Sequence, residues 1–155
     1  MLQTPPPLDQ TALRLGYAGL LPQAFALILL LEGESMAWIA TAGGYAYAAL
    51  IFSFLGGMWW TFAMLNDGAP RWIYGAAIAP SLIALATFLP WTWGWEWPGP
   101  SLLVLSISLL LSPKVDGAIA RAVAVPDGWL RLRLHLSLGL GILTAALAMA
   151  ALAQL

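Results

Sequence analysis

The sequence predicts an all-α fold, an integral membrane bundle of five transmembrane helices with the N-terminus inside and the C-terminus outside. Three observations predict this class. Of the 155 residues, 61% are hydrophobic and 8% are charged, whereas soluble domains have about 45–50% apolar and about 25% charged residues. Five apolar stretches are candidates for the roughly 20-residue helices that cross a bilayer core. Every basic residue falls on one side of the membrane when these five stretches alternate in direction.

The expected spans form one transmembrane domain over residues 1–155. The second span is long enough to tilt or to extend beyond the lipid, and the fourth is the shortest. The fourth could continue past Pro113, because Val115, Ile119 and Val123 recur every fourth residue as one apolar stripe. In chain order, the spans cover about 11–31, 37–65, 72–89, 98–111 and 130–155.

The last span begins with the alternating run LRLRLHLSLGLG, which is typical of a strand. An open strand cannot cross lipid, because each unpaired N–H or C=O group there costs several kcal/mol. The run that follows, ILTAALAMAALAQL, has a helical composition. We therefore expect a helix here, with Asp127 as its N-cap.

The basic residues set the expected orientation. With the N-terminus in the cytoplasm, the loops around 32–36 and 91–97 and the C-terminal tail lie outside and contain no Lys or Arg. An arrangement without the fourth span would place four basic residues outside. The first span lacks a cleavage site, and no Arg- and Ser-rich transit peptide precedes it, which favours the bacterial inner (cytoplasmic) membrane. The residues expected inside are Arg14, Arg71, Lys114, Arg121, Arg131 and Arg133.

The nine tryptophans are expected at the membrane edges, where an amphipathic indole ring is most favourable. In the run LPWTWGWEWPGP four of them alternate, and an extended ribbon would direct all four rings to one side at headgroup level. Anchoring is the favoured interpretation, with a binding surface for a cation, a quinone or a pigment as the alternative. The outer belt contains Trp38, Trp91, Trp93, Trp95 and Trp97, and the inner belt contains Trp59, Trp60, Trp72 and Trp129.

Several kinds of chemistry are disfavoured. The absence of cysteine excludes disulfides, thiolate nucleophiles and sulfur metal ligands, and a net charge of −1 offers no basic field for nucleic acid. No ionisable residue falls near a span centre. His135, the single histidine, is expected to face a neighbouring helix or headgroups rather than a metal. Without a nucleophile elbow, phosphate loop or paired-carboxylate motif, we expect no enzyme, no catalytic residue and no cofactor.

Two sets of residues are candidates for binding and packing. Pro22 interrupts the first span beside Gln23, and Pro80 interrupts the third. Plain kinks are the favoured interpretation; the alternative is a site for a small apolar molecule formed with Trp91, Trp93, Trp95 and Trp97. In the second span Ala49, Ser53 and Gly57 recur every fourth position with Gly56 adjacent, so this face would allow close helix packing.

Several of these segments together resemble a small family of multi-pass membrane proteins that carry a domain of unknown function. The segments are LGYAGLLP at 15–22, YAALIFSFLGGMWW at 47–60, Pro80, Asp116 and PDGWLRLRLHLS at 126–137. The family is shared by proteobacteria and mitochondrial transmembrane-protein-69-like proteins. Its members often have His-Trp-Gly after the double glycine, where this chain has Trp59, Trp60 and Thr61. The resemblance implies a multi-pass inner-membrane protein and supplies no established activity.

Two functions are compatible with these features. The first is a non-enzymatic accessory or assembly component of a membrane complex, which would contact the lipid bilayer and other membrane helices and would not bind nucleic acid. The alternative is a facilitator or binder of a small apolar molecule such as a lipid, a quinone or a pigment.

Overall fold

The computed structural model describes residues 8–153, apart from the side chains of Glu34 and Ser35, and this part of the chain is helical without a strand. Five stretches are long and apolar enough to cross a membrane, namely Gln10–Glu32, Met36–Leu65, Trp72–Thr92, Gly99–Ala122 and Trp129–Leu152. The predicted all-helical fold with five such stretches is confirmed. The elements are α1 (Gln10–Ala18), α2 (Leu21–Leu29), η1 (Leu30–Glu32), α3 (Glu34–Leu65), α4 (Trp72–Thr92), α5 (Gly99–Ala122) and α6 (Trp129–Leu152).

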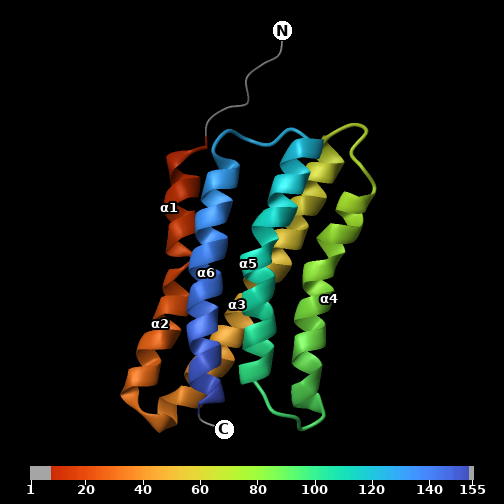
Figure 1. The fold of residues 1–155 in the computed structure, drawn as a ribbon. Coiled ribbons are helices and arrows are strands. Elements are labelled where there is room, and N and C mark those ends of the chain that lie inside the picture. Colours follow the sequence, from red (N-terminus) through yellow and green to blue (C-terminus); the bar gives the residue numbers. More distant parts are fainter. Residues whose placement is uncertain (1–7, 154–155) are drawn as a thin grey trace.

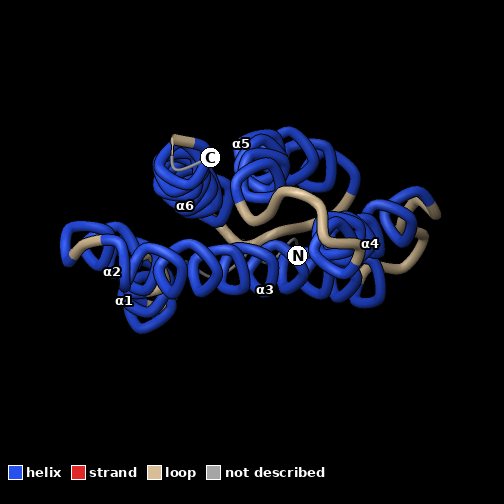
Figure 2. The backbone as a smooth tube through the Cα atoms, turned by 90° about the horizontal axis from the view of Figure 1, so that it is seen from below, coloured by secondary structure: helices blue, strands red, loops and turns tan. Residues whose placement is uncertain are grey.

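The helices pack around α3, which runs obliquely across the bundle (Figures 1 and 2). α5 and α6 lie side by side against it, α4 packs along it from Tyr45 to Trp60, and α1 and α2 lie at the opposite side of the bundle. The two chain ends emerge at opposite ends of the bundle (Figure 1). The centre is filled by buried side chains from α3, α5 and α6, including Phe52, Leu55, Leu105, Leu109 and Leu147.

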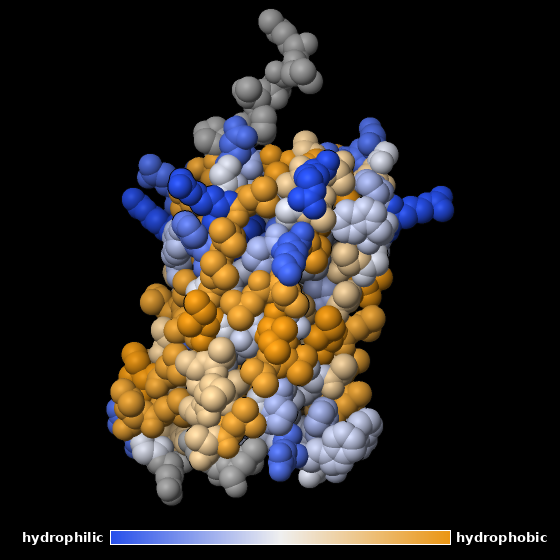
Figure 3. Space-filling view, viewed as in Figure 1, coloured by the Kyte–Doolittle hydropathy of each residue, from blue (hydrophilic) through white to orange (hydrophobic). Residues whose placement is uncertain are grey.

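The two ends of the bundle differ in charge. The end from which the N-terminus emerges also bears the loops 66–71 and 123–128, and hydrophilic residues gather there in Figure 3. All six basic residues and the four aspartates lie toward this end, which gives it a formal charge of +2. Among the described side chains, the opposite end carries the carboxylates of Glu32 in η1 and Glu96 in the loop between α4 and α5, a formal charge of −2. Between the ends, the face shown in Figure 3 is mainly hydrophobic.

Two helix limits differ from the sequence-based expectation. α5 continues through Pro113 to Ala122 rather than ending near residue 111, because the stripe that begins at Val115 packs into the core, where Ile119 is fully buried. The expectation that Asp127 caps the last helix is wrong. Gly128, with φ 80°, precedes α6 and no side chain caps it, since glycine reaches this left-handed conformation without steric cost.

The contact between α3 and α4 is close because it depends on Gly56. A Cβ atom added there would lie 2.1 Å from the carbonyl oxygen of Ala77 and 3.4 Å from Cγ of Pro80. Gly57, its neighbour, is exposed, and a Cβ added there would have no atom within 4 Å. Of the four residues expected to support close packing, Gly56 therefore contacts α4 most closely, whereas Ala49 and Ser53 are partly buried at the side of this contact.

The two prolines act differently. α1 ends at Ala18 and α2 begins at Leu21 with Pro22 in its first turn, so the first span is broken. The Tyr47 hydroxyl of α3 donates a hydrogen bond to the Gly19 carbonyl at this break, as neighbouring helices commonly do for backbone groups freed in membrane helices. Pro80 lies within α4, which remains one continuous helix and buries this ring against α3.

The tryptophan run is not an extended ribbon, and that expectation is wrong. α4 continues through Pro90 to Thr92, so Trp91 lies in a helical turn, and Gly94 with φ 72° then reverses the chain. Trp97 turns inward, with its ring centroid 4.9 Å from that of Tyr45. The other three rings of the run, on Trp91, Trp93 and Trp95, are 50–65% exposed.

The inner tryptophan belt also needs correction. Trp60 and Trp72 are exposed as expected, at 41% and 45%. Trp59 and Trp129 are 3% and 5% exposed, so they belong to the protein interior rather than to a surface that could contact lipid. Trp129 packs edge-on against Phe62 of α3, and Trp59 faces the buried charges described next.

Candidate functional site

A buried ion pair joins α5 to α6 near the basic end of the bundle. Nε of Arg133 lies 3.2 Å from Oδ2 of Asp116, and the two residues are 6% and 1% exposed. Asp116 lies in the part of α5 beyond Pro113, and Arg133 lies in the second turn of α6. Charged side chains inside membrane spans are rare and usually mark functional positions. The pair is therefore the starting point for a candidate site.

Hydrogen bonds extend this pair into a network across three helices. Nε1 of Trp59 in α3 donates to Oδ1 of Asp116 over 2.7 Å. Nη2 of Arg133 donates to Oγ of Ser137 over 3.1 Å, and the hydroxyls of Ser137 and Ser112 lie 2.9 Å apart. Oδ1 of Asp116 thus accepts a hydrogen bond from Trp59, while Oδ2 faces Arg133 in the ion pair. The network fixes the positions of α3, α5 and α6 relative to one another.

A buried ion pair is tolerated in the fold only when both charged partners are present. Two charges taken out of water lose several kcal/mol of solvation each, and their attraction offsets this only when both partners are present. Removing one partner leaves an uncompensated charge and costs about 3–5 kcal/mol. The ion pair is therefore weak evidence for stability by itself, but a rearrangement of α5 against α6 that separated the two charges would be costly.

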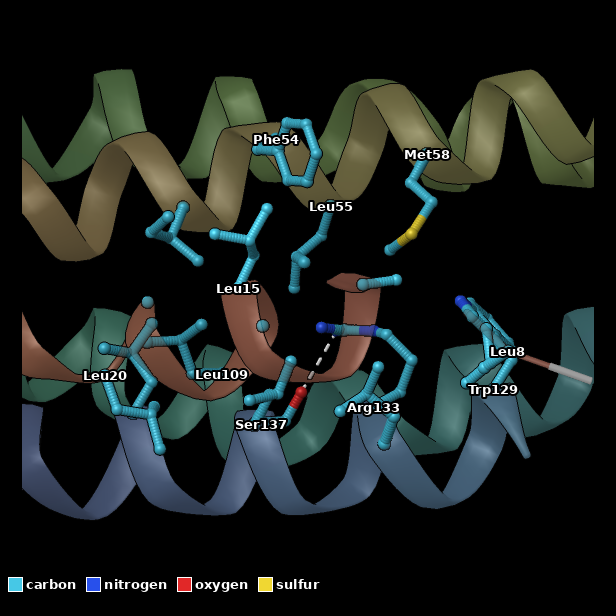
Figure 4. Close-up of a pocket in the computed structure, with 17 residues that line it drawn as sticks. Leu8, Leu15, Leu20, Phe54, Leu55, Met58, Leu109, Trp129, Arg133 and Ser137 are labelled. Atoms are coloured by element: carbon cyan, nitrogen blue, oxygen red, sulfur yellow. Dashed lines mark hydrogen bonds between the residues drawn. The ribbon is translucent and has the colours of Figure 1, made fainter. Parts of the chain in front are cut away.

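An apolar cavity of about 490 Å³ lies beside the ion pair, between α1, α3 and α6. Arg133 and Ser137 stand on its wall, and Figure 4 shows the hydrogen bond between them facing the cavity. Leu15 and Phe54 also line it, and each is 68% exposed, so the cavity opens to the side of the bundle. Most other lining residues are aliphatic, among them Leu20, Ile51, Leu55, Met58, Leu132, Leu136 and Leu140.

Two glycines, one in α1 and one directly after it, help to create this space. Gly16 and Gly19 both line the cavity and present no side chain to it. A Cβ atom added at Gly16 would lie 3.2 Å from Cδ1 of Leu136, so α1 rests on the ends of leucine side chains of α6. Because leucine side chains separate the two backbones, the helices do not close on each other as α3 and α4 do. The result is a gap that a ligand of moderate size could enter.

The ligand-binding residues proposed from the sequence lie elsewhere. Pro22 is exposed on α2, and Gln23 is fully buried, with Nε2 donating to Oγ1 of Thr144 over 3.0 Å. Pro80 packs on α3, and Trp91, Trp93, Trp95 and Trp97 lie at the opposite end of the bundle. Within the described part of the chain, these residues do not line the cavity beside the ion pair. A role for them in binding stays a prediction.

His135 faces a neighbouring helix, as expected. Its Nδ1 atom lies 2.8 Å from the Tyr17 hydroxyl of α1. Among residues 8–153, no group of three or more His, Asp and Glu side chains is arranged to hold a metal ion.

Sequence reasoning missed the residues that form the network, although a signal for them exists. Arg133, Ser137 and Thr144 recur on one face of the last helix and are all buried. Ser112 and Asp116 are one turn apart in α5 and are also buried. Polar residues in phase on one face of an otherwise apolar helix indicate that this face points into the bundle.

Comparison with known proteins gives one match. The model of a family described as "Protein of unknown function (DUF3429)" matches residues 8–150. Neither the comparison with curated proteins nor the comparison with solved structures gives a match.

Proposed function

This chain belongs to the DUF3429 family of proteins of unknown function, and we propose that it is a non-enzymatic membrane protein that binds a small amphiphilic molecule between α1, α3 and α6. The observation that carries the proposal is the cavity of about 490 Å³ with two polar side chains on an otherwise apolar wall. Small-molecule sites typically have about 300–1,000 Å³ and a few convergent polar groups. The cavity has both properties.

The setting that we propose is the bacterial inner membrane, with the basic end of the bundle in the cytoplasm. The concentration of all six basic residues toward one end supports this orientation. It predicts that a reporter fused to the C-terminus is active when the reporter requires the periplasm. A C-terminal reporter that is active in the cytoplasm alone would contradict this orientation.

In a bilayer, the polar head of the ligand would decide binding more than its chain. An alkyl chain that moves from lipid into the cavity leaves one apolar medium for another, so it gains little from the hydrophobic effect. Hydrogen bonds from Arg133, whose position Ser137 helps to fix, would supply the preference for one molecule over the surrounding lipid. Entry would take place from the side, past Leu15 and Phe54.

The arrangement of the polar groups favours binding over catalysis. General acid–base chemistry requires a group that is free to exchange a proton with the bound molecule. Both oxygens of Asp116 face Arg133 and Trp59, and the carboxylate does not line the cavity in the described part of the chain. We therefore propose a protein that holds or passes on its ligand without changing it.

Analysis of co-purified molecules tests this function. The full chain is purified in mild detergent, and small molecules are extracted and quantified by mass spectrometry. We expect a discrete amphiphile with the wild type, a strong reduction in the cavity variant Ala12→Phe, and no reduction in Ala18→Phe, because Ala18 lies on the same helix outside the cavity lining. A wild-type protein without such a molecule, or equal retention by both variants, would contradict the function.

A second candidate function is an accessory component that binds a transmembrane helix of another protein. The groove between α3 and α4 supports it, because small side chains line this groove and would allow close helix approach. A photo-crosslinking residue at Ser53 should then capture one discrete partner, and Ala49→Leu should abolish the capture. Crosslinks to lipid alone, or a monomer without a partner after gentle purification, would exclude this candidate. The small residues are Ala42, Ala46, Ala49, Ser53, Ser81 and Ala84.

A further inference from the structure

We infer that the ligand of the cavity is an uncharged amphiphile whose head accepts hydrogen bonds through carbonyl oxygens, as a quinone does. The inference rests on the proposed function, because it assumes that the cavity between α1, α3 and α6 binds a small molecule. It goes beyond that function in assigning the chemistry of the head and the residue that recognises it, Arg133.

The ligand must accept hydrogen bonds from the N–H groups of Arg133 at the cavity wall. A guanidinium group has five N–H donors and no acceptor. Among the contacts of the described residues, Nε faces Asp116 and Nη2 donates to Ser137, which leaves further N–H groups at the cavity wall. The wall around them is largely aliphatic. A ligand that satisfies them must therefore present acceptors.

The ion pair between Arg133 and Asp116 also determines which charge the ligand can carry. The carboxylate of Asp116 lies 3.2 Å from Nε of Arg133, so the charges at this wall already cancel. An anionic head would compete with Asp116 for Arg133, and a buried carboxylate without its partner is strongly unfavourable. A cationic head would meet the donors of Arg133 and no free carboxylate among the lining residues described. An uncharged acceptor satisfies the donors without disturbing the pair.

The elongated shape of the cavity favours a ligand with a ring at one end and an apolar tail. The cavity extends from Trp129 near the basic end of the bundle, past Arg133 and Ser137, to Leu20 at the break between α1 and α2 (Figure 4). The head would lie beside Arg133, with the aromatic side chains of Trp129 and Phe54 also lining the cavity. The chain would run toward Leu20 along the bundle, in the direction of the lipid chains. An acceptor-bearing ring with an apolar tail matches this layout.

Three probes with similar alkyl chains separate the alternatives. Decylubiquinone has an uncharged ring with carbonyl acceptors, monododecanoylglycerol has an uncharged ester carbonyl, and dodecanoate is anionic. Each is titrated into the purified full chain in detergent, and the dissociation constant is measured by native mass spectrometry. We expect decylubiquinone to bind at least about tenfold more tightly than dodecanoate, because the carboxylate of dodecanoate would compete with Asp116 for Arg133 and leave a buried charge without its partner.

Paired variants assign the effect to Arg133. The double variant Asp116→Asn/Arg133→Gln removes both charges together, so that neither is left unpaired, and should weaken decylubiquinone binding about tenfold or more. Arg131→Gln, an exposed arginine in the same helix that does not line the cavity, should leave binding unchanged. A thermal unfolding measurement of each variant confirms that it is folded.

The outcomes distinguish this inference from the function on which it rests. If monododecanoylglycerol binds as tightly as decylubiquinone, recognition of a carbonyl acceptor is supported, and the natural ligand is then an ester lipid rather than a quinone. If dodecanoate binds equally well or better, and Ala12→Phe abolishes that binding, the inference is overturned while the binding function stands. If no probe binds in a manner sensitive to Ala12→Phe, both are overturned.

Discussion

The contact between α3 and α4 and the contact between α1 and α6 both include glycines, but these glycines face different partners. Gly56 of α3 meets backbone, since a Cβ atom there would lie 2.1 Å from the Ala77 carbonyl oxygen. Gly16 of α1 meets the end of the Leu136 side chain, and Gly139 of α6 similarly meets that of Leu20, with hypothetical Cβ distances of 3.2 and 3.0 Å. At Gly56 the backbones of α3 and α4 approach too closely for a ligand to lie between them, whereas leucine side-chain ends hold α1 and α6 apart. The second arrangement produces a cavity.

The two contacts also differ in their polar groups. Near α4, Tyr45 and Thr87 form hydrogen bonds with each other and with the Ala84 carbonyl, and all these groups are uncharged. Beside the cavity, a full ion pair and a hydrogen-bonded serine stand at the wall. In the function that we propose, α3 and α4 form a fixed scaffold, while α1 closes over a site that Arg133 recognises.

The largest expected effect comes from breaking the ion pair. Asp116→Asn leaves Arg133 buried without its counter-charge and should lower the free energy of unfolding by about 3–5 kcal/mol. The double variant Asp116→Asn/Arg133→Gln should be clearly more stable than Asp116→Asn alone. Denaturant titration in detergent micelles measures both. A single variant that loses less than about 1 kcal/mol would show that the pair is not buried as described.

The next effect comes from the close α3–α4 contact. Gly56→Ala should lower the free energy of unfolding by about 1–3 kcal/mol, because the added methyl group overlaps the Ala77 backbone. Gly57→Ala is the matched control in the same helix, and should be neutral or slightly stabilising, since alanine is the better helix former. Equal effects of the two substitutions in the same denaturant titration would refute the packing described for α3.

The smallest effect is expected on the cavity side. Gly16→Ala places a methyl group against the flexible end of Leu136, which can shift by a few tenths of an ångström. The free energy of unfolding should change by less than about 1 kcal/mol, as the higher helix propensity of alanine offsets the contact. Ligand retention should fall because Gly16 lines the cavity. A destabilisation as large as that of Gly56→Ala would contradict the difference between the two contacts.

The sequence predicts the helical stretches well because the bilayer imposes a constraint on length and apolarity that can be read locally. It leaves the end of α5 open, either near residue 111 or beyond Pro113 along the apolar stripe that begins at Val115, and the structure confirms the continuation to Ala122. Lys114 and Asp116 make the segment after Pro113 look like the end of a span, but Asp116 is buried by its partner on the next helix. Such pairing depends on how two helices are rotated and aligned, which apolar periodicity does not specify.

The same limit explains the other errors. The double glycine at 56 and 57 indicates a smooth helix face, but composition does not say that Gly56 faces α4 while Gly57 is exposed. The alternating tryptophans resemble a ribbon, yet α4 continues past Pro90 to Thr92. The sequence predicts a membrane-edge position for Trp59, since the residue that accepts its indole N–H, Asp116, is distant in sequence.

A structure of the full chain extracted with its native lipids tests the central claim most directly. The account predicts ordered density between α1, α3 and α6, with its polar end within hydrogen-bonding distance of Arg133 and its apolar end near Leu20. An empty or closed gap, with α1 packed directly on α3 and Arg133 held by protein groups alone, would contradict it.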